Sequence, residues 1–403
     1  MLAARGCHRI VRPKLWAEDG GVFLPQAYDA GWRSLFEPYA GYFQAIPRLV
    51  ALVATWLPVE FAPVLFLVIS GLLLAFCLSE PASSRFIAVR GGPAVRTLVC
   101  AALCLSPGLN EVFGNIANLY AVVALWLLLI GAREAGTALR WPDRLALPLC
   151  AFTAGGAAVL FPLFAWRVVK YRRADDVFAA ACIAAAALAN AASYHSLPAA
   201  TLASLGDRMA ASLHALAYGM ALAPLAGTIG APRLWSFVPA AYLAMSALLI
   251  AALAAAALRD RTRETTPLAI AAACYALLPF LVSAVRSGSA AVLAPGPTEG
   301  FAWFRYSFQL APVGLLAWTA LLSRWPKRLA PWPALLLAAL AFCLGVERWG
   351  LDEYYGLRWS AALEDARVTG ACKSEINDIE IPIAPPGWRA RIPKRALCAN
   401  PLP

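Results

Sequence analysis

The sequence predicts an all-α integral membrane protein in which about ten helical segments cross the bilayer or dip into it. Its composition supports this fold class, because 61% of the 403 residues are hydrophobic and only 14% are charged. Soluble domains are about 45–50% apolar and about 25% charged. The mean hydropathy of +0.65 points the same way, since a soluble fold of this size leaves too much surface in water to hide so many apolar side chains. Long apolar runs separated by short charged clusters complete the pattern.

Three regions follow one another along the chain. Residues 1–58 form a head, 59–347 a polytopic transmembrane domain, and 348–403 a charged, proline-rich tail. A hydrocarbon core of about 30 Å needs roughly 20 apolar residues per helix, which sets the length expected of a crossing. The predicted segments are 59–79, 95–107, 116–132, 145–154, 157–168, 177–195, 236–258, 267–285, 306–323 and 332–347.

The run from Arg144 to Arg167 is too long for one helix and carries Gly155-Gly156 at its middle. We therefore expect a tight hairpin of two short helices with both outer ends on one side of the membrane. Under this arrangement sixteen basic residues fall in short loops on one side and four on the other. Cytoplasmic loops are enriched in Lys and Arg, so the richer side is predicted to be cytoplasmic. The head and the tail then lie outside the cytoplasm.

The sixteen basic residues are Arg85, Arg90, Arg96, Arg133, Arg140, Arg144, Arg167, Lys170, Arg172, Arg173, Arg259, Arg261, Arg263, Arg324, Lys327 and Arg328. Because they are spread over several loops, the net charge of +11 does not form one basic stripe. Nucleic acid is therefore not an expected partner.

The head contains a conflict. Arg5, Arg9, Arg12 and Lys14 should resist export, yet the topology places the residues that follow them outside, and no secretory apolar region precedes them. We expect a first transmembrane helix upstream of residue 1 that the given start omits. Residues 42–57 form an amphipathic helix candidate that should lie in the outer interface.

The tail is expected to be a small ordered appendage resting on the membrane domain. Seven cysteines lie in apolar segments, where they behave as small apolar residues. Cys372 and Cys398 share the tail, and an exported location allows a disulfide between them. No zinc-ligand spacing is present.

The strongest candidate for chemistry is Glu18-Asp19, within Trp16-Ala17-Glu18-Asp19-Gly20-Gly21. Adjacent carboxylates on an outer loop beside apolar helices can act as a general base or hold a divalent cation. The competing interpretation is a solvated acidic turn, since Asp-Gly is common in turns. No other cofactor is indicated.

The acidic motif, followed by residues 38–42 (Pro-Tyr-Ala-Gly-Tyr) and by Pro47-Arg48-Leu49, resembles a family of bacterial multi-pass proteins. That family is similar to the membrane glycosyltransferases of the GT-C superfamily. The likeness is specific over residues 16–49, and looser at 111–120, at 305–306 and at residues 385–388 (Pro-Pro-Gly-Trp). The missing first helix is the departure from the pattern.

The resemblance implies a GT-C-like fold and a transferase in the bacterial inner membrane. A carboxylate of the first outer loop would serve as catalytic base, with Asp19 the first candidate and Glu18 the second. The implied donor is a sugar linked to polyprenyl phosphate, and the acceptor is a glycan or lipid of the cell envelope.

Further residues could contact such a donor. Arg305 with Tyr306, and Arg48, could stabilise the departing phosphate, although both arginines could equally anchor the chain at the interface. Asn115, Asn118 and Glu111 could bind sugar hydroxyls, with helix capping as the alternative for Asn115.

Two other functions compete with sugar transfer. One is a transporter or flippase of envelope precursors, and the other is a non-catalytic membrane scaffold. Transporters favour ionisable residues at the bilayer midplane and repeated halves. The predicted segments show neither feature, which favours the transferase.

Overall fold

In the computed structural model, the described residues are 7–83, 85–86, 92–106, 109–193, 239–259, 266–285, 300–322, 336, 339, 358–369, 371–375 and 377–398. Within them the chain is mostly helical, as the sequence predicts. The predicted segment 332–347 and residues 1–6 lie outside the described residues, apart from two single positions in the former.

The longer helices of the bundle agree closely with the predicted segments. They are α5 (Ala62–Ser79), α6 (Gly92–Cys104), α8 (Leu119–Gly131), α9 (Trp141–Thr153), α10 (Phe161–Tyr171), α11 (Ala174–Ser193), α14 (Pro239–Arg259), α15 (Thr266–Val285) and α17 (Gly300–Leu322). Two helices in the described part are long and apolar enough to cross a membrane, over Val59–Ala82 and Ala174–Ser193. The structure therefore shows a helical chain with two candidate membrane-crossing helices, and the predicted number of about ten stays a prediction.

Helix α8 is the centre of the bundle. Every one of its residues except Tyr120 is buried, and it packs against α5, α9 and α17. A helix that is apolar on all sides is stable only when neighbours surround it. At 1.5 Å per residue its 13 residues extend roughly 20 Å. Polar side chains that lie at its two ends are therefore far apart, and they are described separately below.

The predicted hairpin is present. Helix α9 ends at Thr153, a 3-10 turn follows over Ala157–Leu160, and α10 runs back from Phe161. Gly155 lies so close to the head that a Cβ there would be 2.7 Å from the ring of Tyr42. The amphipathic helix of the head, α4 (Ala45–Ala54), begins beside it, where the Ile46 amide donates to Thr153 Oγ1 at 2.9 Å. The glycine pair thus ends one helix and makes room for the head.

The remaining elements of the head are short. They are α2 (Cys7–Val11), the π-helical turn η1 (Asp19–Phe23), α3 (Leu24–Ala30) and the 3-10 turn η2 (Gly31–Phe36). A short helix, α7 (Leu109–Val112), precedes α8.

The tail is an ordered appendage, but it contains strands that the sequence did not predict. After α19 (Trp359–Val368), β1 (Asp378–Ile383) and β2 (Trp388–Pro393) form an antiparallel hairpin, followed by α20 (Lys394–Cys398). The alternating Ile379, Ile381 and Ile383 are buried, a period-two pattern that indicates a strand. Cys372 and Cys398 form a disulfide with a Cα–Cα distance of 5.9 Å.

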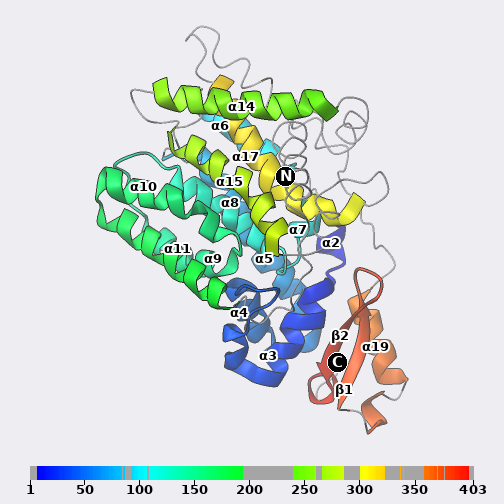
Figure 1. Cartoon of the computed structure of the whole chain (residues 1–403). Coiled ribbons are helices and arrows are strands. Elements are labelled where there is room, and N and C mark those ends of the chain that lie inside the picture. The colour runs from blue at the N-terminus through cyan, green and yellow to red at the C-terminus, as the bar shows by residue number, and fades with distance from the viewer. Residues whose placement is uncertain are drawn as a thin grey trace.

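Figure 1 shows the tail beside α3 at one end of the molecule, with α14 lying across the other end. Specific contacts fix the tail there. The Trp359 indole N–H donates to the carbonyl of Val59 at 3.1 Å, and Arg367 pairs with Glu60. Residues about 300 positions apart are therefore joined at the start of α5.

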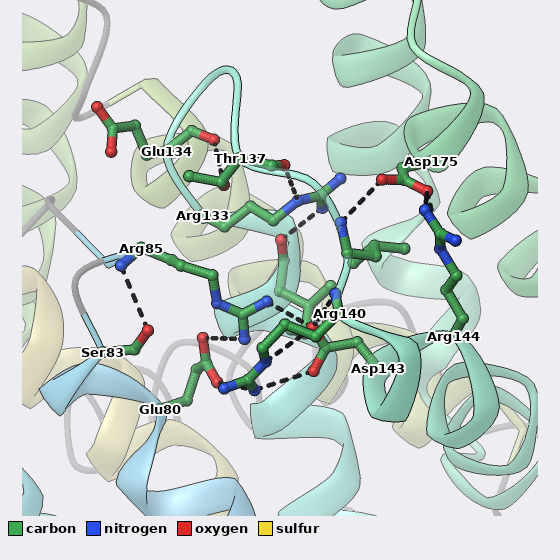
Figure 2. Close-up of polar contacts among 12 residues, drawn as sticks. Glu80, Ser83, Arg85, Arg133, Glu134, Thr137, Arg140, Asp143, Arg144 and Asp175 are labelled. Carbon is green, nitrogen blue, oxygen red and sulfur yellow. Dashed lines mark hydrogen bonds and ion pairs between the residues drawn. The ribbon is translucent and has the colours of Figure 1, made fainter.

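Arginines that the topology prediction assigns to one side of the membrane gather with carboxylates in one cluster. Arg85 pairs with Asp143 at 2.5 Å and with Glu80 at 2.6 Å, and Arg140 reaches both acids (Figure 2). These residues come from the end of α5, the loop after it and the start of α9. The loops that contain them therefore meet at one end of the bundle.

A second group of ion pairs lies at the end of α8. Oδ1 of Asp176 accepts from Arg133 at 2.6 Å and from Arg167 at 2.8 Å, and each of these side chains is at most 1% exposed. The two arginines also donate to carbonyls in the last turn of α8 and just beyond it, at Ile130, Gly131 and Arg133. Cationic side chains at a helix C-terminus satisfy its free carbonyls and complement its dipole.

Candidate functional site

The acidic motif lies at the opposite end of α8. Asp19 opens η1 and has no exposed surface. Its Oδ1 accepts the amide of Ala117 at 2.9 Å, and its Oδ2 accepts the amide of Ile116 at 3.4 Å. Those amides belong to the turn that leads into α8. The solvated acidic turn considered above is therefore excluded for Asp19.

Burial dominates the electrostatics of Asp19. Removal from water raises its pKa well above the usual range, and neighbouring Glu18 adds to this, whereas the two amides and Arg9 oppose it. A carboxylate with a raised pKa is a stronger base once it is ionised. Glu18 is partly exposed, and its Oε2 is buried without a hydrogen-bond partner among the described residues.

Arg9 belongs to this site, although the sequence suggested only a topological role for it. Its guanidinium lies 4.9 Å from the ring centroid of Trp16 and donates to the carbonyl of Phe113. Gly114, at φ +84°, lets the arginine pass, because a Cβ there would lie 3.0 Å from Arg9 Cδ. One feature of the sequence could have indicated this role, because the basic run that contains Arg9 directly precedes the acidic motif.

Arg48 is the most deeply buried cation among the described residues of the head. It is 1% exposed, donates from Nη1 to Gln26 Oε1 at 2.9 Å, and lies 4.0 Å from Glu37. Its Nε and Nη2 are buried with no partner among the described residues. Burial lowers the pKa of Arg48 to about 10, so the side chain stays charged at neutral pH.

Phe23 connects the acid and the cation. It ends η1, one turn after Asp19, and its ring centroid lies 5.5 Å from the Arg48 guanidinium carbon. Helix α4 also packs directly against η1. The structure thus places Arg48 against the short segment that contains Asp19.

The tail hairpin covers the outer side of η1. The Ala17 amide donates to the carbonyl of Ala384 at 2.5 Å. A Cβ on Gly20 would lie 2.8 Å from Ile383 Cδ1, and a Cβ on Gly21 would lie 2.9 Å from the ring of Trp388. The two glycines after the acid pair are therefore required for close packing, which explains this part of the motif physically.

The other predicted residues divide into two groups. Asn115 Oδ1 accepts the Asn118 amide at 3.0 Å, and both side chains are buried. This local turn before α8 favours the structural interpretation of Asn115 over sugar binding. The side chains of Glu111, Arg305 and Tyr306 lie outside the described residues.

A divalent cation at Glu18 and Asp19 receives no support from the geometry. Among the described residues, no group of three or more His, Cys, Asp or Glu side chains could hold a metal ion. Both Asp19 oxygens also face N–H donors, which compete with a cation for the same lone pairs.

An apolar groove of about 470 Å³ lies beside α4. Helices α4, α5 and α9 form it, and its walls consist only of apolar side chains, including Leu49, Val53 and Leu72. Leu49 directly follows Arg48 on α4, so a surface suited to a hydrocarbon chain begins one residue from the buried cation.

Comparison with known proteins identifies no relative. No family model, curated protein or solved structure matches the chain. The resemblance in the acidic motif therefore stays a prediction, and the function has to be argued from the geometry of the site.

Proposed function

We propose that the protein is a membrane glycosyltransferase that moves a sugar from a polyprenyl-phosphate donor to a cell-envelope acceptor. The proposal includes the predicted arrangement of about ten membrane segments, with the head and the tail outside the cytoplasm. The observation that supports it best is a carboxylate excluded from water on a segment that also contacts a buried arginine, two of whose nitrogens have no partner among the described residues.

The chemistry requires a base and a stabilised leaving group. In the proposed reaction, an acceptor hydroxyl oxygen forms a bond to the anomeric carbon while the bond from that carbon to the phosphate oxygen breaks. Asp19 takes the hydroxyl proton, and polyprenyl phosphate leaves with the electron pair of the broken bond. The two amides that hold Asp19 fix the direction of its carboxylate before the reaction.

Arg48 suits the leaving phosphate. Its Nε and Nη2 could donate a pair of hydrogen bonds to phosphate oxygens. In a site shielded from water, such bonds stabilise developing negative charge strongly. The apolar groove beside Leu49 supports a donor with a lipid chain.

One observation favours a second candidate, a non-catalytic scaffold. Asp19 accepts hydrogen bonds from backbone amides at one end of α8, while Arg133 and Arg167 donate hydrogen bonds to backbone carbonyls at the other end. Asp19 could thus be a structural cap that satisfies buried backbone groups. The scaffold and the transferase differ in what the loss of the Asp19 charge should do.

The test replaces the chromosomal gene with variants of the full chain and analyses extracted lipids. Asp19→Asn should accumulate one polyprenyl-phosphate sugar, as a deletion strain also should, with the protein present in the membrane at the native level. Glu364→Gln is the matched control, because it neutralises an exposed carboxylate of α19. Normal lipids in the Asp19→Asn strain would refute the catalytic role, and a loss of folded protein would support the structural cap.

A further inference from the structure

Two adjoining hollows lie on the surface where the head meets the tail. One, of about 600 Å³, is formed by the end of α3, the end of α4 and α20. The other, of about 760 Å³, lies between α3, α20 and the open end of the tail hairpin, where β1 begins and β2 ends. Both include Tyr28 and Arg395 in their walls, so they form one continuous surface. Each volume falls within the range of small-molecule sites.

The first hollow is aromatic. Trp32 is 64% exposed and Trp56 is 74% exposed, and both lie in its wall with Tyr28. Two exposed indoles beside a half-buried phenol are unusual for a surface without a ligand. Burial and nearby Glu60 raise the pKa of Tyr28 to about 12, so its hydroxyl stays protonated and can donate.

The second hollow is polar. Arg391, on β2 beside it, pairs with Asp378 at 2.8 Å and with Asp29, and so it holds both carboxylates in place. Lys394 and Arg395 lie in the wall as well. The three cations exceed the two carboxylates by one charge, which favours a ligand with an acidic group.

The combination matches the chemistry of carbohydrates. A sugar ring presents a face of C–H groups, which stacks on an aromatic ring, and an edge of hydroxyls that both donate and accept. On this surface the indoles can stack on the C–H face of a sugar, and the neighbouring carboxylates and cations can form hydrogen bonds with its hydroxyls. We propose that this surface, between Trp56 and Asp378, binds an oligosaccharide that carries carboxylate groups.

The charges argue against a bilayer anchor as the role of these aromatics. Moving ionised groups into hydrocarbon is costly, and the adjoining hollow contains or borders five of them. Helix α4 presents a different, wholly apolar side to the groove beside Leu49 and Val53. That side is the one suited to lipid.

The binding test is independent of sugar transfer. The full chain in lipid nanodiscs is titrated with a hexamer of galacturonic acid and with neutral cellohexaose. We expect the acidic oligosaccharide to bind more tightly. Trp32→Ala combined with Trp56→Ala should weaken binding by about tenfold or more, since both rings available for stacking are lost. Arg395→Gln should reduce the preference for the acidic probe.

Trp141→Ala is the matched control, because Trp141 is 73% exposed at the start of α9, away from both hollows. Failure of the acidic oligosaccharide to bind the native protein overturns the proposal, and so does equally tight binding of neutral cellohexaose. So does equal binding by the double variant, or an equal loss in Trp141→Ala. Weaker retention of the double variant in phosphatidylglycerol vesicles, with oligosaccharide binding unchanged, would identify bilayer anchors instead.

Under the proposed function, the oligosaccharide would be the acceptor, and this assignment alone rests on that proposal. Asp19→Asn should retain binding, because Asp19 is buried outside both hollows. In the native protein, binding of the oligosaccharide without sugar transfer would leave the surface proposal standing and refute the transferase. Sugar transfer without oligosaccharide binding would refute the surface proposal and leave the transferase standing.

Discussion

Arg48 is a buried arginine whose guanidinium is only partly hydrogen-bonded among the described residues. A structural arginine in a protein interior normally satisfies its guanidinium with several acceptors. Arg48 is 1% exposed, bonds to Gln26 and leaves Nε and Nη2 unpartnered among the described residues. A ligand with anionic oxygens would satisfy both nitrogens, which is why the proposed phosphate lies there.

Arg48→Met should therefore separate function from stability. Burying a charge costs desolvation energy that few partners repay, and Arg48 has only a neutral hydrogen-bond partner and a carboxylate 4.0 Å away among the described residues. We expect an unchanged or higher melting temperature together with loss of sugar transfer. Gln26→Leu, which removes only the existing partner, should leave more activity than Arg48→Met. A large fall in melting temperature for Arg48→Met would show that the arginine supports the fold, and would remove it from the proposed mechanism.

The acidic turn η1 and the tail hairpin form one packed unit. Gly20 packs against Ile383 and Gly21 against Trp388, so closely that an added Cβ would force a neighbour to move. The Ala17 amide also donates a hydrogen bond to the carbonyl of Ala384. The element that carries Asp19 is thus held by residues more than 360 positions away. Its position depends on the tail as much as on the head.

Gly20→Ala should loosen this unit. The added methyl would approach Ile383 to 2.8 Å and Ala390 to 3.0 Å, and overpacking of this kind costs roughly 1–3 kcal/mol. We expect a lower melting temperature and faster amide hydrogen exchange in residues 15–23. Gly71→Ala is the control, because its nearest neighbour, Phe113, is 3.9 Å away and alanine favours a helix. Equal effects of the two variants would contradict the packing argument.

Over the whole molecule, α8 joins two polar clusters through an apolar core. Asp19 lies at one end, and the Arg133–Asp176–Arg167 cluster lies at the other. The buried carboxylate of Asp176 is shared by two arginines that hold the last turn of the helix. Much of the stability of the bundle should depend on this cluster, since breaking a buried ion pair strands an uncompensated charge.

Asp176→Asn is predicted to be the most destabilising of these changes. It leaves Arg133 and Arg167 buried without their shared anion, at a cost of about 3–5 kcal/mol. The loss should appear in the melting temperature and in the yield of folded protein from membranes. Glu380→Gln, which breaks an exposed pair with Arg389, should cost about 1 kcal/mol or less. A small effect of Asp176→Asn would show that water reaches the cluster.

Much of the helical arrangement followed from local patterns. Apolar runs predicted α5, α8 and α11 to within a few residues, and Gly155-Gly156 predicted the break between α9 and α10. The tail strands were missed because their alternation is short and interrupted by prolines. At the site, Glu18-Asp19 and Arg48 could be named in advance, whereas the role of Arg9 could not.

Composition and hydrophobic periodicity were sufficient to establish a helical, strongly apolar chain. The reason is that burial of a helix requires apolar residues at a regular spacing, which is visible within each stretch of the sequence. Contacts between remote residues leave no such record. The closure of the tail over Gly20, the placement of Arg9 against Trp16 and the sharing of Asp176 by two arginines all depend on how particular side chains fit together after folding. For that reason the acids of the site could be found by reading along the chain, but their surroundings emerged only once the chain was packed in three dimensions.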